Sequence, residues 1–176
     1  MGDYELHNEE IAVCIALLGA ELKSLKDIHS GREYMWSGDP AFWKRVSPVL
    51  FPLVGNYRNK QAVYEGKAYP LSQHGFARDR EFTLVSQTDE EAWFALESDE
   101  TTRECYPFDF RLELGYRLSG REVEVLWRVK NTGKETMYFS IGGHPAFACP
   151  LNEAGNKEGY SFWFESGEPL ETRIIG

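Results

Sequence analysis

The stretch "FRLELGYRLSGREVEVLWRV", residues 110–129, decides the fold class of this chain. Apolar side chains occupy alternate positions on both sides of the Ser119-Gly120 turn signal, and a period of two is that of a β-strand. The stretch therefore predicts an antiparallel hairpin with one buried and one solvated face. The buried set is predicted to be Phe110, Leu112, Leu114, Tyr116 and Leu118, followed by Val123, Val125, Trp127 and Val129.

Further hairpins and strands are expected on both sides of this one. "AVYEGKAYPL" (62–71) predicts a hairpin that turns near Glu65-Gly66-Lys67, and "EFTLVSQ" (81–87) with "AWFALES" (92–98) predicts another. "MYFSIG" (137–142) and "YSFWFES" (160–166) are rich in aromatic and β-branched residues, which favours strands. The chain is thus predicted to be all-β, an antiparallel sandwich or barrel.

The apolar segment 11–26, "IAVCIALLGAELKSLK", is open to two interpretations. Its good helix formers are compatible with a helix. Gly19 interrupts it, however, and "IAVCI" is partly β-branched. We favour two strands that meet at a Gly19-Ala20 corner.

Composition and charge limit the class of protein. A chain of 176 residues with 42% hydrophobic residues predicts one domain over residues 1–176 with its own core. A net charge of −9 disfavours nucleic acid and membrane surfaces as partners. The acidic start lacks the basic region of a secretory signal, and three cysteines without metal-type spacing are typical of reduced thiols. A cytoplasmic location is therefore expected.

Two histidines stand in short stretches with unusual neighbours. His74 lies in "QHGFARD" (73–79), where Gly75 permits a sharp turn and Arg78 offers a cationic fork for hydroxyls or a carboxylate. His144 lies in "GGHPAF" (142–147), where Pro145 restricts it to the extended region. Each has an ordinary alternative: a loop histidine, a strand-ending turn, or for Arg78 a salt bridge with Asp79 or Glu81.

Several chemistries lack support in the sequence. Two histidines without a carboxylate or cysteine at ligand spacing do not predict a metal site. The motifs of serine nucleophiles, phosphate-binding loops and dinucleotide sites are not found. Acid–base chemistry on an uncharged substrate remains, and sugars fit a sheet-lined cleft with aromatic walls.

Four stretches in order resemble the aldose 1-epimerase (galactose mutarotase-like) family, in its LacX-like branch. They are "GAELKSL", "YMWSGDPAFWKRVSPVLFPLVGN", "YEGKAYPLSQHGFARDREF" and "SIGGHPAFACPL", and they cover the chain from about Leu18 to Leu151. The resemblance implies the N-terminal part of an antiparallel β-supersandwich. It also implies an isomerase that interconverts the α and β anomers of a free aldose, with no cofactor and with a small-molecule aldose as its partner.

The resemblance implies a role for each histidine. His144 matches the general acid that protonates the ring oxygen, and His74 matches the histidine that binds around the ring oxygen and C1. Arg78 would orient the sugar. The family usually carries an arginine after the glycine of "LVGN", where this chain has Asn56. Arg58, two residues on, is expected on the same face of a strand as a partial substitute.

The family's catalytic base is a glutamate well past "GGHPAF", and Glu165, Glu168 and Glu171 match none of its motif. We therefore expect a chain truncated at its C-terminal end, with exposed apolar faces that favour a homodimer. Two alternatives stay open. One is a non-catalytic carbohydrate-binding sandwich, and the other is a hexose-6-phosphate 1-epimerase in which Arg78 and Arg58 receive the phosphate.

Overall fold

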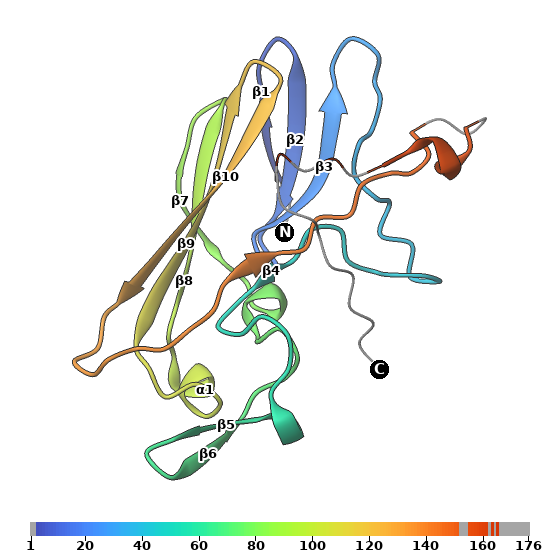
Figure 1. Cartoon of the computed structure of the whole chain (residues 1–176). Helices are drawn as coiled ribbons and strands as arrows, with labels where there is room; N and C mark the ends of the chain where they lie inside the picture. Colours follow the sequence, from blue (N-terminus) through green and yellow to red (C-terminus); the bar gives the residue numbers. More distant parts are fainter. Residues whose placement is uncertain (1–2, 152–154, 162, 164, 166–176) are drawn as a thin grey trace.

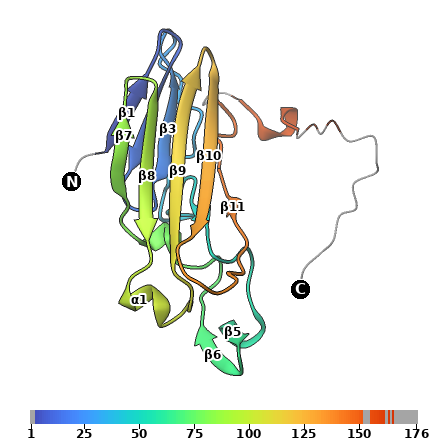
Figure 2. The same cartoon turned by 90° about the vertical axis from the view of Figure 1, so that its left-hand side faces the viewer.

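Two antiparallel sheets face each other across a shared core. The computed structural model describes residues 3–151, 155–161, 163 and 165. A three-stranded sheet has the order β1-β2-β3, and a four-stranded sheet has the order β10-β9-β8-β7 (Figure 1). The strands are β1 (Tyr4–His7), β2 (Ile11–Ala16), β3 (Glu21–Asp27), β7 (Thr83–Gln87), β8 (Glu91–Glu97), β9 (Phe110–Ser119) and β10 (Glu122–Asn131). Figure 2 shows the larger sheet in front of the smaller one.

Two small two-stranded pairings complete the strands. β4 (Val49–Leu50) pairs with β11 (Gly142–Gly143), and β5 (Gln61–Tyr64) pairs with β6 (Lys67–Pro70). The helical turns are short: η1 (Arg58–Lys60), η2 (Ala77–Asp79), α1 (Glu100–Arg103) and η3 (Lys157–Gly159). None of the helices in the described part of the chain has the length and apolarity needed to span a bilayer.

The predicted hairpins are confirmed. β9 and β10 pair with Ser119 opposite Glu122, and β5 and β6 turn through Glu65 and Gly66, which both have positive φ. The two-strand interpretation of segment 11–26 is also confirmed. β2 and β3 meet at Gly19 (φ 73°) and Ala20 (φ 44°), a left-handed corner that a helix would not contain.

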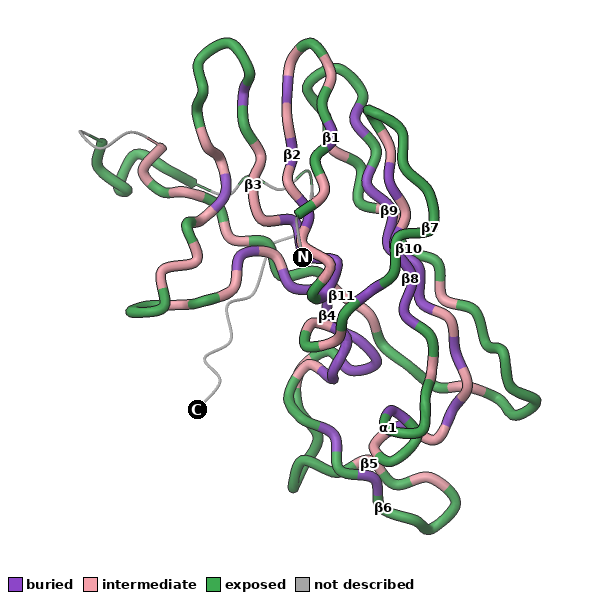
Figure 3. The backbone as a smooth tube through the Cα atoms, turned by 180° about the vertical axis from the view of Figure 1, so that it is seen from behind, coloured by how far each residue is buried: buried purple, intermediate pink, exposed green. Residues whose placement is uncertain are grey.

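The core lies between the sheets and continues below them (Figure 3). Alternate residues of β9 are buried as predicted, and Phe110 packs edge-on against Phe51 with ring centroids 5.1 Å apart. Phe51 has no exposed surface and directly follows β4. The chain around β4 is therefore anchored in the core by Phe51 together with the buried neighbours Val49, Leu50 and Leu53, and this anchoring matters for the site it carries.

Two of the predicted strands are not found. In "MYFSIG", Met137–Ile141 form no strand, and only Gly142 enters a ladder, as part of β11. The Ser140 amide instead makes a single hydrogen bond to the Pro52 carbonyl (2.9 Å). In "YSFWFES", the described residues Tyr160, Ser161, Trp163 and Glu165 are irregular, and the others lie outside the described residues. β propensity gives a strand only where a neighbouring edge is free to pair.

The inner face of β10 is less buried than its alternation predicts. Val125 and Trp127 are 47% and 43% exposed, and they line an apolar groove of about 450 Å³ together with residues of β3 and with Phe147. The predicted burial of this strand is therefore only partly correct. The prediction of a homodimer, which depends on such exposed apolar surface, stays a prediction.

Candidate functional site

One stretch of chain, residues 46–55, holds both candidate histidines. On one side it pairs with the "GGHPAF" segment, with Leu50 opposite Gly142 and Val49 opposite Gly143. The pairing continues as the His144 amide donates to the Pro48 carbonyl (3.1 Å). His144 therefore follows β11 directly, and its side chain is exposed at the edge of the fold.

On its other side the same stretch receives the turn that carries His74. The Phe76 and Ala77 amides both donate to the Phe51 carbonyl, at 3.0 and 3.1 Å. Gly75 lies so close that a Cβ atom there would be 2.2 Å from the Phe51 oxygen, and its φ is +71°. Only glycine fits this position, and His74 beside it is itself left-handed, with φ 66°.

His74 and Gly55 are joined by two hydrogen bonds. The His74 amide donates to the Gly55 carbonyl (2.8 Å), and the Gly55 amide donates to Nδ1 of His74 (3.0 Å). An Nδ1 that accepts a hydrogen bond carries no proton, so the neutral ring holds its proton on Nε2. Burial lowers the pKa of His74, and the positive charge of Arg78 and the proximity of His144 lower it further. His74 thus offers a neutral Nε2–H donor near pH 7.

The fold brings the two predicted histidines together. Their ring centroids lie 6.5 Å apart, with an angle of 64° between the ring planes. Trp43 also lies beside His144, with its ring centroid 4.9 Å from the imidazole. Two imidazoles and one indole therefore line a single place on the surface, which can bind a small polar ring and exchange protons with it.

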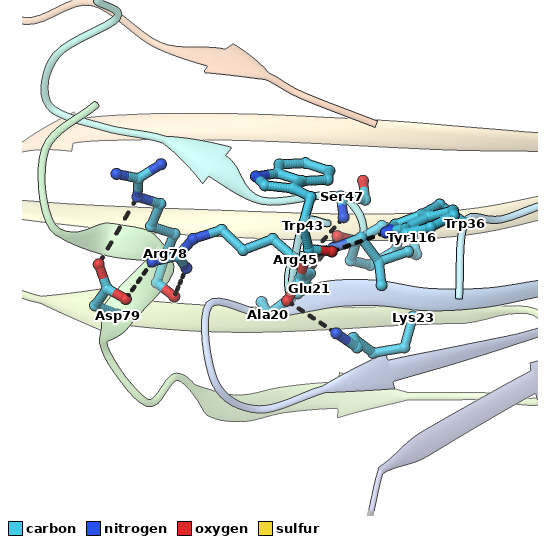
Figure 4. A network of polar contacts seen from close by, with 11 residues as sticks. Ala20, Glu21, Lys23, Trp36, Trp43, Arg45, Ser47, Arg78, Asp79 and Tyr116 are labelled. Carbon is cyan, nitrogen blue, oxygen red and sulfur yellow. Dashed lines mark hydrogen bonds and ion pairs between the residues drawn. The ribbon is translucent and has the colours of Figure 1, made fainter. Parts of the chain in front are cut away.

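Arg78 is placed beside this pair through the His74 turn. It lies in η2, and its Nη2 donates to the Gln73 carbonyl (2.7 Å). Its Nε is buried without a hydrogen bond to any described residue, 3.7 Å from Oδ2 of Asp79, so the predicted contact with Asp79 exists but is long. Burial and the nearby Arg45 lower the pKa of Arg78, and Asp79 opposes them. Arg45 takes the closer bond to Asp79, at 2.7 Å (Figure 4).

Asn56 and Arg58 are less closely tied to the site. Both side chains are exposed, and in the described part of the chain no hydrogen bond or ion pair joins either of them to the two histidines. Arg58 begins the turn η1 rather than lying in a strand. The expectation that it shares a strand face with Asn56 is therefore wrong, and their roles in substrate binding stay predictions.

Sequence reasoning assigned no role to Trp43, Arg45 or Glu21. All three lie in the stretches that carry the family resemblance, and "FWKR" places an aromatic residue among basic ones. That pattern was the available signal for Trp43 and Arg45. Among residues 3–151 and the described positions beyond them, no group of three or more His, Cys, Asp or Glu side chains is arranged to hold a metal ion.

Comparison with known proteins finds one matching family and several similar proteins. The model of the aldose 1-epimerase family matches residues 2–174. The plasmid-encoded protein LacX of Lactococcus lactis subsp. lactis is 37% identical over 170 residues, which are 93% of this chain and 56% of LacX.

Solved structures agree with this placement. A galactose mutarotase related enzyme from Lactobacillus acidophilus is 43% identical with a TM-score of 0.87, over 89% of this chain and 52% of that one. A galactose mutarotase-like protein from Lactobacillus casei ATCC 334 is 36% identical with a TM-score of 0.83, over 86% and 52%. The predicted galactose mutarotase-like β-sandwich is confirmed, and the chain spans about half the length of these relatives. The chain belongs to the aldose 1-epimerase family.

Proposed function

We propose that this chain is an aldose 1-epimerase-type isomerase that interconverts the α and β anomers of a free aldohexose, with His144 as its acid. The observation that carries the proposal is the pair of imidazoles 6.5 Å apart, both held by residues 46–55. Mutarotation needs a proton delivered to the ring oxygen while another is removed from the hydroxyl on C1. Histidine titrates near neutral pH, so it can give the first proton and take it back.

The residues divide the work according to their surroundings. His74, with Nδ1 occupied by the Gly55 amide, donates its Nε2–H to a sugar oxygen and holds the ring in place. His144 is exposed, and its ring forms no hydrogen bond with the described residues, so it is free to act as the acid. It protonates the ring oxygen as the C1–O5 bond breaks and a base removes the O1 proton to form the aldehyde. Rotation about C1–C2 and the reverse steps give the other anomer.

A carbohydrate-binding protein without turnover is the second candidate. Neither His74 nor His144 forms a hydrogen bond or ion pair with a carboxylate in the described residues, so no contact of the two histidines identifies a base. Binding would then use the same donors, with no anomer exchange. A hexose-6-phosphate substrate is the variant in which Arg78 and Arg58 meet the phosphate.

The test follows the optical rotation of freshly dissolved α-D-glucose, α-D-galactose and α-D-glucose 6-phosphate with this chain and its His144→Ala form. A faster decay with the wild-type chain that His144→Ala slows by about 10²–10⁴-fold supports the isomerase. Preference for the phosphorylated sugar selects the phosphate variant. Sugar binding by calorimetry without any faster decay supports the binding protein, and no binding at all rejects both.

A further inference from the structure

Trp43 stands next to the proposed acid, held in place from both ends of its loop. On the N-terminal side, its amide donates to the Asp39 carbonyl (2.9 Å), and Nε1 of Trp36 donates to the Trp43 carbonyl (2.8 Å). Its indole lies against His144 with an angle of 47° between the rings, and the residue is only partly buried. A fixed and partly exposed aromatic ring therefore lies beside the acid.

On the C-terminal side, a buried carboxylate fixes the loop. Oε1 of Glu21 accepts hydrogen bonds from the Val46 amide (2.6 Å) and the Ser47 amide (2.8 Å), and Glu21 is 9% exposed. Figure 4 shows these bonds leading from β3 to the loop that carries Trp43. Charge-assisted hydrogen bonds of this kind are about twice as strong as neutral ones, so they fix the loop end firmly.

A second arm of the loop is tied to the His74 turn. Arg45 donates from Nη2 to Asp79 (2.7 Å) and from Nη1 to the Arg78 carbonyl (3.4 Å). Trp43, two residues earlier, is thus linked through the backbone to the same turn that positions His74. The indole, His144 and His74 form one connected set, although they come from three distant parts of the sequence.

An indole in this position suits one class of ligand. The face of an aromatic ring is negative, and it attracts the weakly positive C–H groups on one face of a pyranose. A sugar whose C–H face rests on Trp43 would have its ring oxygen and C1 oxygen free to reach the two imidazoles. The same contact would discriminate between sugars by the orientation of their ring hydroxyls, since an axial hydroxyl on that face would separate the rings.

We propose that Trp43 is a substrate-binding residue whose indole supports the C–H face of the pyranose beside His144, and that Glu21 is a positioning residue that sets the indole through Val46 and Ser47. The inference rests on the proposed function for the kind of sugar. It adds that the Trp43 indole holds that sugar and that the buried Glu21 carboxylate keeps the indole in place.

The test measures glucose and galactose binding by calorimetry, together with KM and kcat from optical rotation, for Trp43→Ala, Trp43→Phe and the wild-type chain. We expect Trp43→Ala to raise Kd and KM by about tenfold or more, with a smaller change in kcat, and Trp43→Phe to restore most of the affinity. Trp93→Phe is the matched control, because Trp93 bonds Glu91 and lies under Arg128 on the larger sheet. It should leave both constants unchanged.

Glu21 is tested by rescue. Glu21→Ala should raise KM as Trp43→Ala does, whereas Glu21→Gln keeps an oxygen acceptor for the two amides and should fall between Glu21→Ala and the wild type. Circular dichroism and thermal melts show whether each variant is folded. If Glu21→Ala does not fold, the Trp43 variants, changed at a partly exposed side chain, still decide the proposal.

The outcomes separate this inference from the isomerase proposal. Sugar binding by the wild type that Trp43→Ala leaves unchanged overturns the role of Trp43 and not the isomerase. Binding that Trp43→Ala abolishes, without any anomer exchange by the wild type, supports Trp43 and overturns the isomerase. A wild-type chain that binds no aldose overturns both.

Discussion

Nδ1 of His74 lies 3.0 Å from the amide nitrogen of Gly55, and the Gly55 carbonyl accepts the His74 amide at 2.8 Å. The side chain and the backbone of one histidine are thus fastened to one glycine. The bond to Nδ1 selects the tautomer with its proton on Nε2, and it leaves Nε2 as the ring atom free to reach a substrate. Each half of this relationship can be tested separately.

His74→Asn should separate binding from folding. The Asn Oδ1 can replace Nδ1 as the acceptor for Gly55, and asparagine tolerates the left-handed φ of 66°. Nε2 is lost, so we expect kcat/KM or sugar affinity to fall by about tenfold or more while stability stays close to wild type. His74→Ala should lose sugar affinity and stability together, because alanine supplies neither Nε2 nor an acceptor for the Gly55 amide. Calorimetry and urea unfolding make the comparison, and an Asn variant that binds sugar as well as the wild type would contradict it.

The pH dependence of stability should carry the signature of His74. Its pKa is lowered in the folded state, so protonation favours the unfolded chain. The stabilisation is present above the unfolded value of about 6.5 and is lost as the pH falls below it. Urea unfolding at pH 7.5 and pH 5 should therefore show the stability gap between wild type and the less stable His74→Ala variant shrinking in acid, because the wild type loses its His74 contribution there. A stability gap that widens in acid would show that the pKa of His74 is raised, not lowered, in the folded state.

Gly75→Ala should be far more damaging than Gly66→Ala. Both glycines have positive φ, which costs a non-glycine residue about 1–2 kcal/mol. A Cβ at Gly66 would meet no described atom within 4 Å, but one at Gly75 would be 2.2 Å from the Phe51 carbonyl oxygen. We expect about 1 kcal/mol for Gly66→Ala and at least about 3 kcal/mol for Gly75→Ala in urea unfolding, since backbone must shift. Equal losses would mean that the turn does not dock on Phe51.

Tyr116→Phe should weaken the corner that precedes Glu21. The Tyr116 hydroxyl donates to the Ala20 carbonyl (2.6 Å) in the core, and burial raises the pKa of Tyr116, so the hydroxyl stays protonated. Its removal leaves a buried carbonyl without a partner, which costs about 1–3 kcal/mol. Tyr4→Phe is the control, since the Tyr4 ring packs edge-on against Phe94 and its hydroxyl forms no hydrogen bond with the described residues, so its loss should change stability by less than about 0.5 kcal/mol. If Tyr116→Phe lost no more stability than Tyr4→Phe, the hydrogen bond from Tyr116 to Ala20 would not stabilise the corner.

Local patterns were sufficient for the elements that close on themselves. The alternation around Ser119-Gly120 predicted β9 and β10, and Gly19 predicted the corner between β2 and β3, because a hairpin depends on residues close in sequence. The strand expected at Met137–Ile141 failed for the opposite reason. Its sequence favours a strand, but whether a partner edge is free depends on the whole fold.

In the site, too, local sequence predicted some features, and others depend on the whole fold. His74 and His144 were singled out by their glycine and proline neighbours, yet their meeting depends on the Phe51–Gly75 bridge and the β4–β11 pairing, which join distant segments. Trp43 was missed because its role depends on its distance from His144, and no local pattern contains that distance. Arg58 was misjudged because a strand was assumed where the chain makes a turn.

The anchoring of Phe51 in the core has a mechanical consequence for the histidine pair. The segments that carry the two imidazoles are both hydrogen-bonded to one short length of backbone, residues 46–55, so this backbone sets the spacing between the two rings. When the two sheets fluctuate relative to each other, the two histidines should move together as one rigid unit. When Phe51 is dislodged, both histidines should be released at once, and the site should vanish in one step rather than degrade gradually.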